Sequence, residues 1–199
     1  FIGAAEDVGL IADIDNLVLD EAARRCREWA GLPSFQISVN KSPLAFLEGG
    51  GAGWKIGAPE FISVPPNSLA VEITESVLLQ STPEVLRRIA GLRASGVQIV
   101  LDDFGTGYSA MSYLARFDVD GLKIDQGFVR DLIEKPAHRA IASAIINLAH
   151  ELGMVVVAEG VENAEQREWL LGAGCDYAQG FLFSQALPAE EFASLLQQR

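Results

Sequence analysis

The stretch QIVLDDF, residues 98–104, joins a run of mostly apolar residues to two adjacent aspartates and leads into the glycine-rich segment GTGYS, residues 105–109. Short apolar runs of this kind are typical of parallel strands that are covered on both faces. Runs of the same character occur at QISVN (36–40), LAVEITE (69–75), GLKID (121–125), VVVAEG (155–160) and YAQGFLF (177–183). Because they alternate with longer stretches of helical pattern, we predict repeated βα units and an α/β fold.

Helices are expected over residues 14–30, 83–95, 109–116, 138–152, 163–172 and 188–197. Residues that favour a helix start precede or open three of these segments, namely Asp13 with Asp15, Thr82-Pro83, and Asn163. Glycines stand where three helices are expected to end, at Gly96, Gly153 and Gly172.

Residues 49–68 do not fit the alternation, because they are rich in glycine and proline. We interpret them as a surface connection with a short helix around Pro59–Ser63. The segment lacks the Gly-Lys-Ser/Thr ending of a phosphate-binding loop and does not lead from a strand into a helix.

Six βα units in 199 residues indicate a barrel rather than an open sheet. A closed barrel of eight strands typically takes about 250 residues. The predicted fold is therefore a TIM-like (β/α)₈ barrel whose first two strands are absent from this chain.

The composition restricts the possible ligands. A net charge of −12 argues against a nucleic-acid duplex as partner. With only two histidines, His138 and His150, a zinc site held by histidine or cysteine is not expected, so a metal here is expected to have oxygen ligands. The two cysteines, Cys26 and Cys175, are expected to be buried free thiols in a reducing compartment. A small phosphate substrate remains compatible with an acidic pocket, because bound cations reverse the local field.

Polar side chains stand near the C-terminal end of every expected strand: Asn40, Glu72, Glu75, Asp102, Asp103, Lys123, Asp125, Glu159, Glu162 and Gln179. A single carboxylate at such a position is more often a helix cap or an ion-pair partner, and this alternative applies to Glu75, Asp125 and Glu162. Together, however, they mark the end of a barrel at which active sites are built.

The two adjacent aspartates would normally point to opposite faces of their strand. The glycines that follow allow the chain to bend immediately after Asp103, so that both side chains reach one site. Four or more oxygen ligands without histidine or cysteine suit Mg²⁺ or Mn²⁺. Bridging carboxylates would set two such ions about 3.5–4 Å apart, as in two-metal phosphoester hydrolysis.

The segments SVNKSP, VEITES, VLDDFGTGYS, LKIDQGFV, VVAEGVEN and GCDYAQGFLF, in this order, resemble the EAL domain family of bacterial cyclic di-GMP phosphodiesterases. The resemblance spans nearly the whole chain, so residues 1–199 are interpreted as a single EAL-type domain. It implies hydrolysis of cyclic di-GMP to linear pGpG with two Mg²⁺ or Mn²⁺ ions. It also implies a cytoplasmic domain, whose parent protein is either soluble or anchored to a membrane.

The resemblance also implies roles for individual residues. The first metal would be held by Asn40, Glu72 and Asp102, and the second by Asp102 and Asp103, with Glu159 close by. Lys123 would hold or polarise the attacking water, and Glu159 would assist its deprotonation. Contacts that orient loops, ligands or substrate would come from Glu75, Asp125, Glu162 and Gln179. The family's mobile loop, which couples metal binding to dimerisation, matches Phe104, Gly105, Thr106, Gly107, Tyr108 and Ser109 and extends to residue 113, so a homodimer is expected.

The chain departs from the family pattern in one large respect, because residues 1–199 do not contain the Glu-Ala-Leu motif. In the family its glutamate is a ligand of the first metal, and we expect it on an upstream strand of the intact protein. A smaller departure is Gly3, where the family usually has proline.

Two alternatives to an enzyme remain. One is a catalytically silent receptor for cyclic di-GMP, and the other is a structural barrel that binds no nucleotide. For the phosphodiesterase that the resemblance implies, a sensor or GGDEF-type domain is expected to be fused to this domain or to regulate it.

Overall fold

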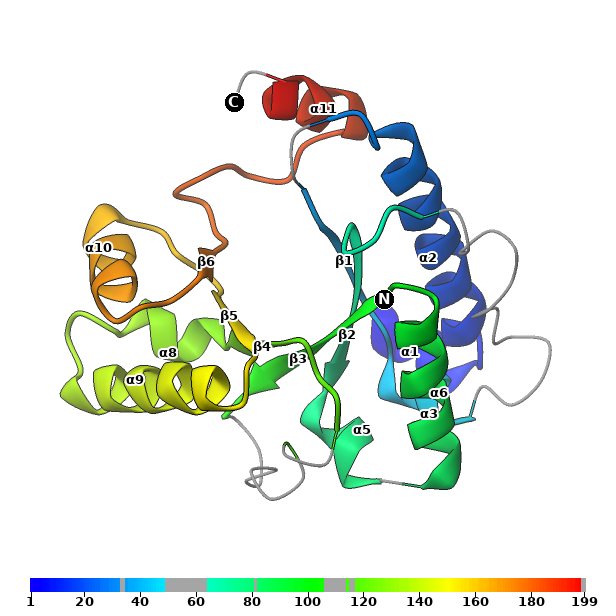
Figure 1. Ribbon diagram of the computed structural model, residues 1–199, viewed down its shortest axis with the longest axis horizontal. Coiled ribbons are helices and arrows are strands. Elements are labelled where there is room, and N and C mark those ends of the chain that lie inside the picture. The colour runs from blue at the N-terminus through cyan, green and yellow to red at the C-terminus, as the bar shows by residue number, and fades with distance from the viewer. Residues whose placement is uncertain (33–34, 49–63, 81, 106–113, 115–116, 198–199) are drawn as a thin grey trace. The chain divides into compact units, whose positions relative to one another are not determined.

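The computed structural model describes residues 1–32, 35–48, 64–80, 82–105, 114 and 117–197. This part of the chain contributes six strands to one sheet, in chain order (Figure 1). The strands are β1 (Ile37–Asn40), β2 (Leu69–Thr74), β3 (Gln98–Phe104), β4 (Gly121–Ile124), β5 (Val155–Ala158) and β6 (Tyr177–Ala178). Pairing is parallel between β1 and β2 and along the series β3, β4, β5 and β6. The predicted α/β fold with a parallel sheet is thus confirmed.

Helices occupy most of the segments between these strands. Those with a sequence prediction are α2 (Ile11–Glu28), α6 (Pro83–Ala94), α9 (Pro136–Glu151), α10 (Ala164–Gly172) and α11 (Ala189–Gln197). The sequence did not predict α1 (Ile2–Asp7), α3 (Pro43–Glu48), α5 (Glu75–Leu79) and α8 (Gln126–Arg130). Apart from Leu114, the helix predicted over 109–116 lies outside the described residues, as does the short helix around Pro59–Ser63.

The predicted helix starts are partly confirmed. Thr82 caps α6 by accepting a hydrogen bond from the Val85 amide, and Asn163 caps α10 by accepting one from the Gln166 amide. The prediction for Asp13 and Asp15 was wrong, because α2 already begins at Ile11 and neither residue caps it.

The predicted helix ends are also partly confirmed. Gly96 and Gly153 follow α6 and α9 with φ values of 79° and 73°, in the left-handed region that glycine tolerates. The prediction for Gly172 was wrong. Gly172 is the last residue of α10, and the left-handed glycine after this helix is Gly174, with a φ of 87°.

The chain divides into two compact units, and the first comprises Phe1–Ile99 with Glu190–Arg199. Its core is built on β2, whose side chains are almost all buried, and on the buried face of α2. A pair of charged residues also lies in this interior. The carboxylate of Asp15 accepts a hydrogen bond from the Ser42 amide at 3.0 Å and lies 3.6 Å from the Lys41 ammonium.

The second unit, Val100–Ala189, contains β4 and β5 with α8 and α9 beside them (Figure 1). Helix α9 begins at Pro136, which suits the first turn of a helix. It buries Ala142, Ile145, Ile146 and Ala149, a spacing that gives one apolar face. In β4 every residue is buried, as expected of a strand covered on both faces.

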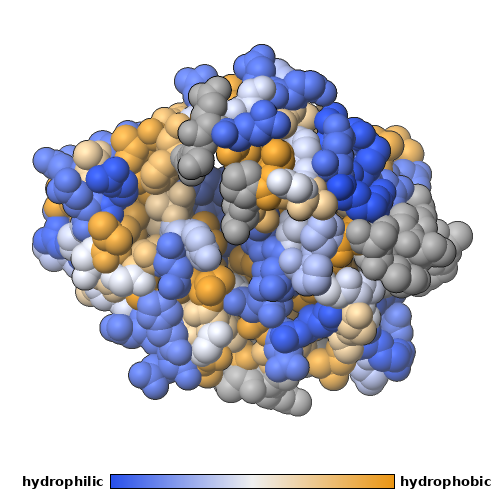
Figure 2. All heavy atoms as spheres, turned by 45° about the horizontal axis from the view of Figure 1, so that its top comes forward, coloured by the Kyte–Doolittle hydropathy of each residue, from blue (hydrophilic) through white to orange (hydrophobic). Residues whose placement is uncertain are grey.

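Among the described residues, no helix combines the length and the apolar character that a membrane span requires. Cys26 and Cys175 are free thiols, as predicted, but the predicted burial is confirmed for Cys26 only, because Cys175 is half-buried. Several large apolar side chains are exposed, including Leu17, Leu171 and Phe181. On the face drawn in Figure 2, hydrophilic residues are interspersed with apolar ones.

Candidate metal centre at the strand ends

A bulge at the end of β3 brings the two adjacent aspartates to one place. Leu101 pairs with Leu122 of β4, and the next pair joins Phe104 to Ile124. Between these pairs β3 has two residues, Asp102 and Asp103, whereas β4 has only Lys123. An extra residue of this kind bends the strand and changes the direction of its side chains.

The backbone of Asp103 shows where the bend begins. Its φ is 54°, in the left-handed region that few residues other than glycine adopt, although aspartate and asparagine are among the exceptions. The bend was expected immediately after Asp103, but it begins at this residue. Gly105, with a φ of 95°, continues it.

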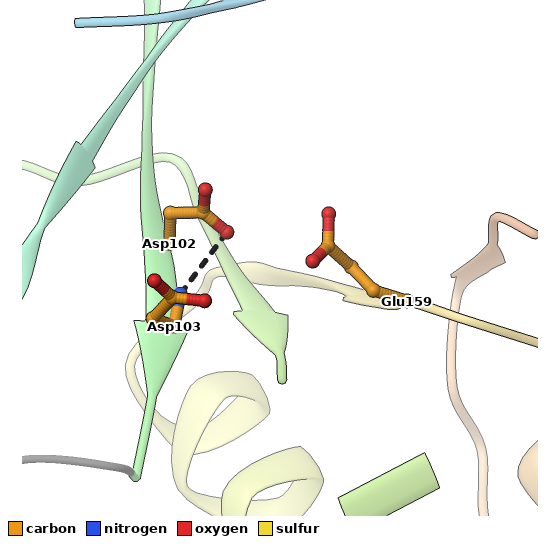
Figure 3. Close-up of side chains that lie close together, drawn as sticks. All are labelled: Asp102, Asp103 and Glu159. Atoms are coloured by element: carbon orange, nitrogen blue, oxygen red, sulfur yellow. Dashed lines mark hydrogen bonds between the residues drawn. The ribbon is translucent and has the colours of Figure 1, made fainter. Parts of the chain in front are cut away.

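Three carboxylates converge at this point. Asp102, Asp103 and Glu159 each offer an oxygen, and these oxygens lie within 4.8 Å of one another. Figure 3 shows Asp102 and Asp103 on β3 and Glu159 directly after β5, with the carboxylate of Glu159 on the side of the aspartates. The Asp103 amide donates a hydrogen bond of 3.0 Å to Asp102 Oδ1, which fixes the Asp102 carboxylate against its own strand.

Lys123 lies between two of these carboxylates. Its Nζ is 3.3 Å from Asp102 Oδ1 and forms a second ion pair with Glu159 Oε1. The side chain of Lys123 is only 5% exposed, so this ammonium has little freedom to move. Three carboxylates and one ammonium leave an excess of two negative charges when all are ionised.

The excess charge is reflected in the electrostatics of Asp103. Asp103 is exposed as a residue, but partial desolvation of its carboxyl raises the pKa, and the nearby charges of Asp102 and Asp125 raise it further, while Lys123 acts in the opposite direction. The ionised form of Asp103 is therefore disfavoured without a further cation. Carboxylate oxygens are the ligands that Mg²⁺ and Mn²⁺ prefer, so the donor set fits such an ion.

Asn40 and Glu72 form a second group, in the first compact unit. They are partners in the register of β1 and β2, and the amide of the next residue, Lys41, donates to the Glu72 carbonyl at 2.9 Å. Glu72 is buried, whereas Asn40 is exposed at the end of its strand. The structure thus brings together Asn40 with Glu72, and Asp102 with Asp103, Lys123 and Glu159.

The remaining predicted residues have varied surroundings. Asp125 caps α8 by accepting a hydrogen bond of 2.9 Å from the Gly127 amide, which matches the ordinary explanation considered for it. Glu75 is buried in the first turn of α5. Glu162 is exposed in the turn 159–163 that carries Glu159, and Gln179 is exposed directly after β6. In the predicted loop, Phe104 is buried and Gly105 is exposed, while Thr106, Gly107, Tyr108 and Ser109 lie outside the described residues.

Gln166 was not predicted from the sequence, although it is buried and accepts hydrogen bonds from the turn after β5. A signal for it was present. Asn163 and Gln166 have the spacing of a capping box, in which the third residue of a helix bonds back to its N-cap.

Parallel βα units with a cluster of carboxylates at the carboxyl ends of the strands define an α/β domain with a site suited to divalent metal. The chain belongs to the EAL domain family, whose family model matches residues 1–186. This confirms the resemblance found in the sequence.

Two curated relatives illustrate the similarity. MucR of Pseudomonas aeruginosa, named a bifunctional diguanylate cyclase/cyclic di-GMP phosphodiesterase, is 42% identical over 193 residues, covering 96% of this chain and 28% of MucR. The signaling protein YkoW of Bacillus subtilis is 38% identical over 197 residues, covering 98% of this chain and 25% of YkoW. The chain therefore spans about a quarter of the length of these relatives.

Solved structures agree with the predicted fold class. The MucR phosphodiesterase in complex with cyclic di-GMP matches with a TM-score of 0.88 and 41% identity, covering 96% of this chain and 78% of that chain. A manganese and cyclic di-GMP complex of Klebsiella pneumoniae BlrP1 matches with a TM-score of 0.75 and 30% identity, covering 87% of this chain and 44% of that chain.

Proposed function

We propose that this chain is the catalytic domain of a metal-dependent phosphodiesterase that hydrolyses cyclic di-GMP to linear pGpG. The observation that carries the proposal is the cluster of Asp102, Asp103 and Glu159 around Lys123. Membership of the EAL domain family supports the same substrate, since the relative MucR is named a cyclic di-GMP phosphodiesterase and has been solved with this nucleotide.

The proposed metal ligands come from both groups of strand-end residues. Asn40, Glu72 and Asp102 would hold one Mg²⁺ or Mn²⁺ ion, and Asp102 and Asp103 would hold another with Glu159 close by. When bound, such ions lower the pKa of a coordinated water and offset the charge of a phosphate group. The upstream glutamate of the Glu-Ala-Leu motif would complete the first set of ligands.

Lys123 and Glu159 are the proposed catalytic residues. Because Lys123 is held between Asp102 and Glu159, its ammonium is fixed where it can orient a water molecule and offset charge on the phosphate. Glu159 is less buried than Lys123 and ends in the same cluster, so its carboxylate can accept a proton from that water.

The proposal is tested by mixing the full-length protein with cyclic di-GMP and Mg²⁺ and separating the products by anion-exchange chromatography. We expect a single new peak at the position of pGpG. Binding of cyclic di-GMP without any pGpG would contradict the proposal and identify a silent receptor instead. If calorimetric titration detects no binding of cyclic di-GMP, both the phosphodiesterase and the receptor function are excluded.

We further propose that the domain acts in the cytoplasm as a homodimer, under the control of a sensor or cyclase domain in the same protein. The curated relatives are about four times as long as this chain, and the name of MucR combines cyclase with phosphodiesterase. Light scattering of the full-length protein should give the mass of a dimer, and a monomer mass would contradict this part of the proposal.

A further inference from the structure

Gln166 is a buried amide with a partner for each of its polar atoms. The residue is 3% exposed and lies in the first turn of α10. Its Oε1 accepts hydrogen bonds from the amides of Glu162 at 2.8 Å and Asn163 at 3.2 Å. Its Nε2 donates to the carbonyls of Val129 at 3.2 Å and Arg130 at 3.3 Å.

These hydrogen bonds connect two segments, one that contains a residue of the candidate metal centre and one that follows the strand of another. Glu162 and Asn163 close the turn that begins with Glu159 after β5. Val129 and Arg130 are the last residues of α8, the helix that follows β4 and its Lys123. Gln166 therefore ties the turn that carries Glu159 to the helix that follows the strand of Lys123.

The near end of the same turn is held by the backbone. The Glu159 amide donates to the Ile124 carbonyl at 3.2 Å, and the Val161 amide donates to the Gln179 carbonyl at 3.0 Å. Space is also limited there, because a methyl group at Gly160 would lie 2.8 Å from Gln126 Cβ. The far end of the turn, at Glu162 and Asn163, is held by Gln166.

An amide is well suited to this position. The Glu162 and Asn163 amides at the start of α10 and the Arg130 carbonyl at the end of α8 have no partner within these helices, while the Val129 carbonyl also accepts a hydrogen bond from the Leu132 amide at 3.2 Å. A glutamine offers an acceptor to the amides and a donor to the carbonyls. Methionine has nearly the same shape but offers neither, and glutamate offers only the acceptor.

We infer that Gln166 is a positioning residue that holds the Glu159 carboxylate against Lys123, an inference that rests on the proposed phosphodiesterase function. Gln166 acts through the turn 159–163, and it contacts neither Glu159 nor Lys123 in any hydrogen bond that the described residues show.

The test compares Gln166→Met with Gln166→Glu in the full-length protein, and Leu170→Ala serves as the control. Leu170 lies four residues further along α10 and is 1% exposed, so its truncation destabilises the same helix without touching the bonds to the turn. All variants are assayed well below their melting temperatures.

Gln166→Met is expected to lower kcat about 10-fold and to raise the Mn²⁺ concentration for half-maximal activity, as loss of an outer partner at a metal site typically does. The KM for cyclic di-GMP should stay within about 2-fold of the wild-type value. A substitution raises KM alone when it removes an interaction that stabilises the bound substrate and the transition state equally, and Gln166→Met removes no such interaction. Gln166→Glu keeps the acceptor for the turn but turns a carboxylate oxygen towards the Val129 and Arg130 carbonyls, so it should also lower kcat.

Two outcomes would overturn the inference. One is an equal loss of kcat in Leu170→Ala and Gln166→Met when the two variants have the same melting temperature. That result would mean that Gln166 only stabilises the fold. The other is a Gln166→Met variant that keeps the wild-type kcat and Mn²⁺ requirement, which would show that the bonds to the turn do not position Glu159.

Hydrogen exchange provides a readout that does not need turnover. The Glu162 and Asn163 amides should exchange faster in Gln166→Met than in Leu170→Ala, and calorimetric Mn²⁺ affinity should fall in the former alone. If the wild-type protein produces no pGpG, the proposed function fails, while exchange and Mn²⁺ affinity still test the positioning role. Unchanged exchange and affinity in Gln166→Met would refute that role.

Discussion

Replacing Asp103 with asparagine should stabilise the metal-free protein and weaken its response to divalent ions. At 4.8 Å, the upper limit of the distances between these carboxylate oxygens, two unit charges repel each other by about 1 kcal/mol in water and about 3.5 kcal/mol at an effective dielectric constant of ~20. The exposure of Asp103 and the attraction of Lys123 reduce this, so we expect a net gain of about 1 kcal/mol. Asparagine tolerates the left-handed backbone at this position, so the bulge should remain.

The sign of the pH dependence follows from the raised pKa of Asp103. As the pH falls, the folded protein takes up this proton before the unfolded chain does, at a pH above the ordinary value of 3.8. The destabilisation of the folded protein by the ionised Asp103 carboxylate therefore disappears at low pH. The advantage of Asp103→Asn should be largest at neutral pH and should shrink as the pH falls through that range.

Thermal unfolding in EDTA and in Mn²⁺ measures both effects. In EDTA the variant should melt about 2–4 °C above the wild type, the shift that 1 kcal/mol produces in a domain of this size. At an Mn²⁺ concentration 100 times the dissociation constant the wild type should gain about 2.7 kcal/mol, and the variant less. Glu134→Gln, which removes an exposed carboxylate before α9, is the charge-matched control and should change neither value appreciably. A variant that melts at or below the wild-type temperature in EDTA, with an undiminished Mn²⁺ response, would refute the electrostatic reasoning.

Three further predictions concern other parts of the chain. Lys41→Met should cost about 3 kcal/mol at pH 7, because it leaves the Asp15 carboxylate buried without its ammonium partner. Burial raises the pKa of Asp15 and Lys41 opposes that rise, so in the variant Asp15 should take up a proton more readily and the loss of unfolding free energy should shrink by pH 5. A loss that grows between pH 7 and pH 5 in urea unfolding would contradict this assignment. Asn163→Ala should lower the free energy of unfolding by about 1 kcal/mol through loss of the capping box, and no change in denaturant titration would count against that cap. Burial raises the pKa of Cys175 to about 11, so its thiol should react with a disulfide reagent at pH 8 only after unfolding, whereas rapid labelling of the native protein would disprove this.

The sequence predicted the strands well where burial alone determines them. The runs that became β2, β3 and β4 are apolar because both faces of a parallel strand are covered, and that demand is visible in the residues themselves. YAQGFLF was predicted as a strand over 177–183, yet only Tyr177–Ala178 pairs. Gly180 explains part of this difference. Its φ is 156°, and a methyl group there would lie 2.3 Å from the Val161 carbonyl oxygen.

The parts of the site that the sequence could not predict depend on contacts distant in the chain. The bulge at Asp102 and Asp103 is a property of the register between β3 and β4, and the sequence of β3 does not specify it. Asp15 has the residue type of a helix cap, but in the fold it pairs with Lys41, 26 positions away. For such residues the local pattern indicates polarity and the tertiary structure decides the partner.

Metal depletion and restoration test the central claim most directly. The full-length wild-type protein and its Asp102→Asn variant are treated with EDTA, desalted, and incubated with cyclic di-GMP before and after addition of Mn²⁺. We predict no pGpG from either protein before the addition, pGpG from the wild type after it, and none from Asp102→Asn at any Mn²⁺ concentration. Equal formation of pGpG by the two proteins, or turnover that persists in EDTA, would contradict a catalytic metal centre at the end of β3.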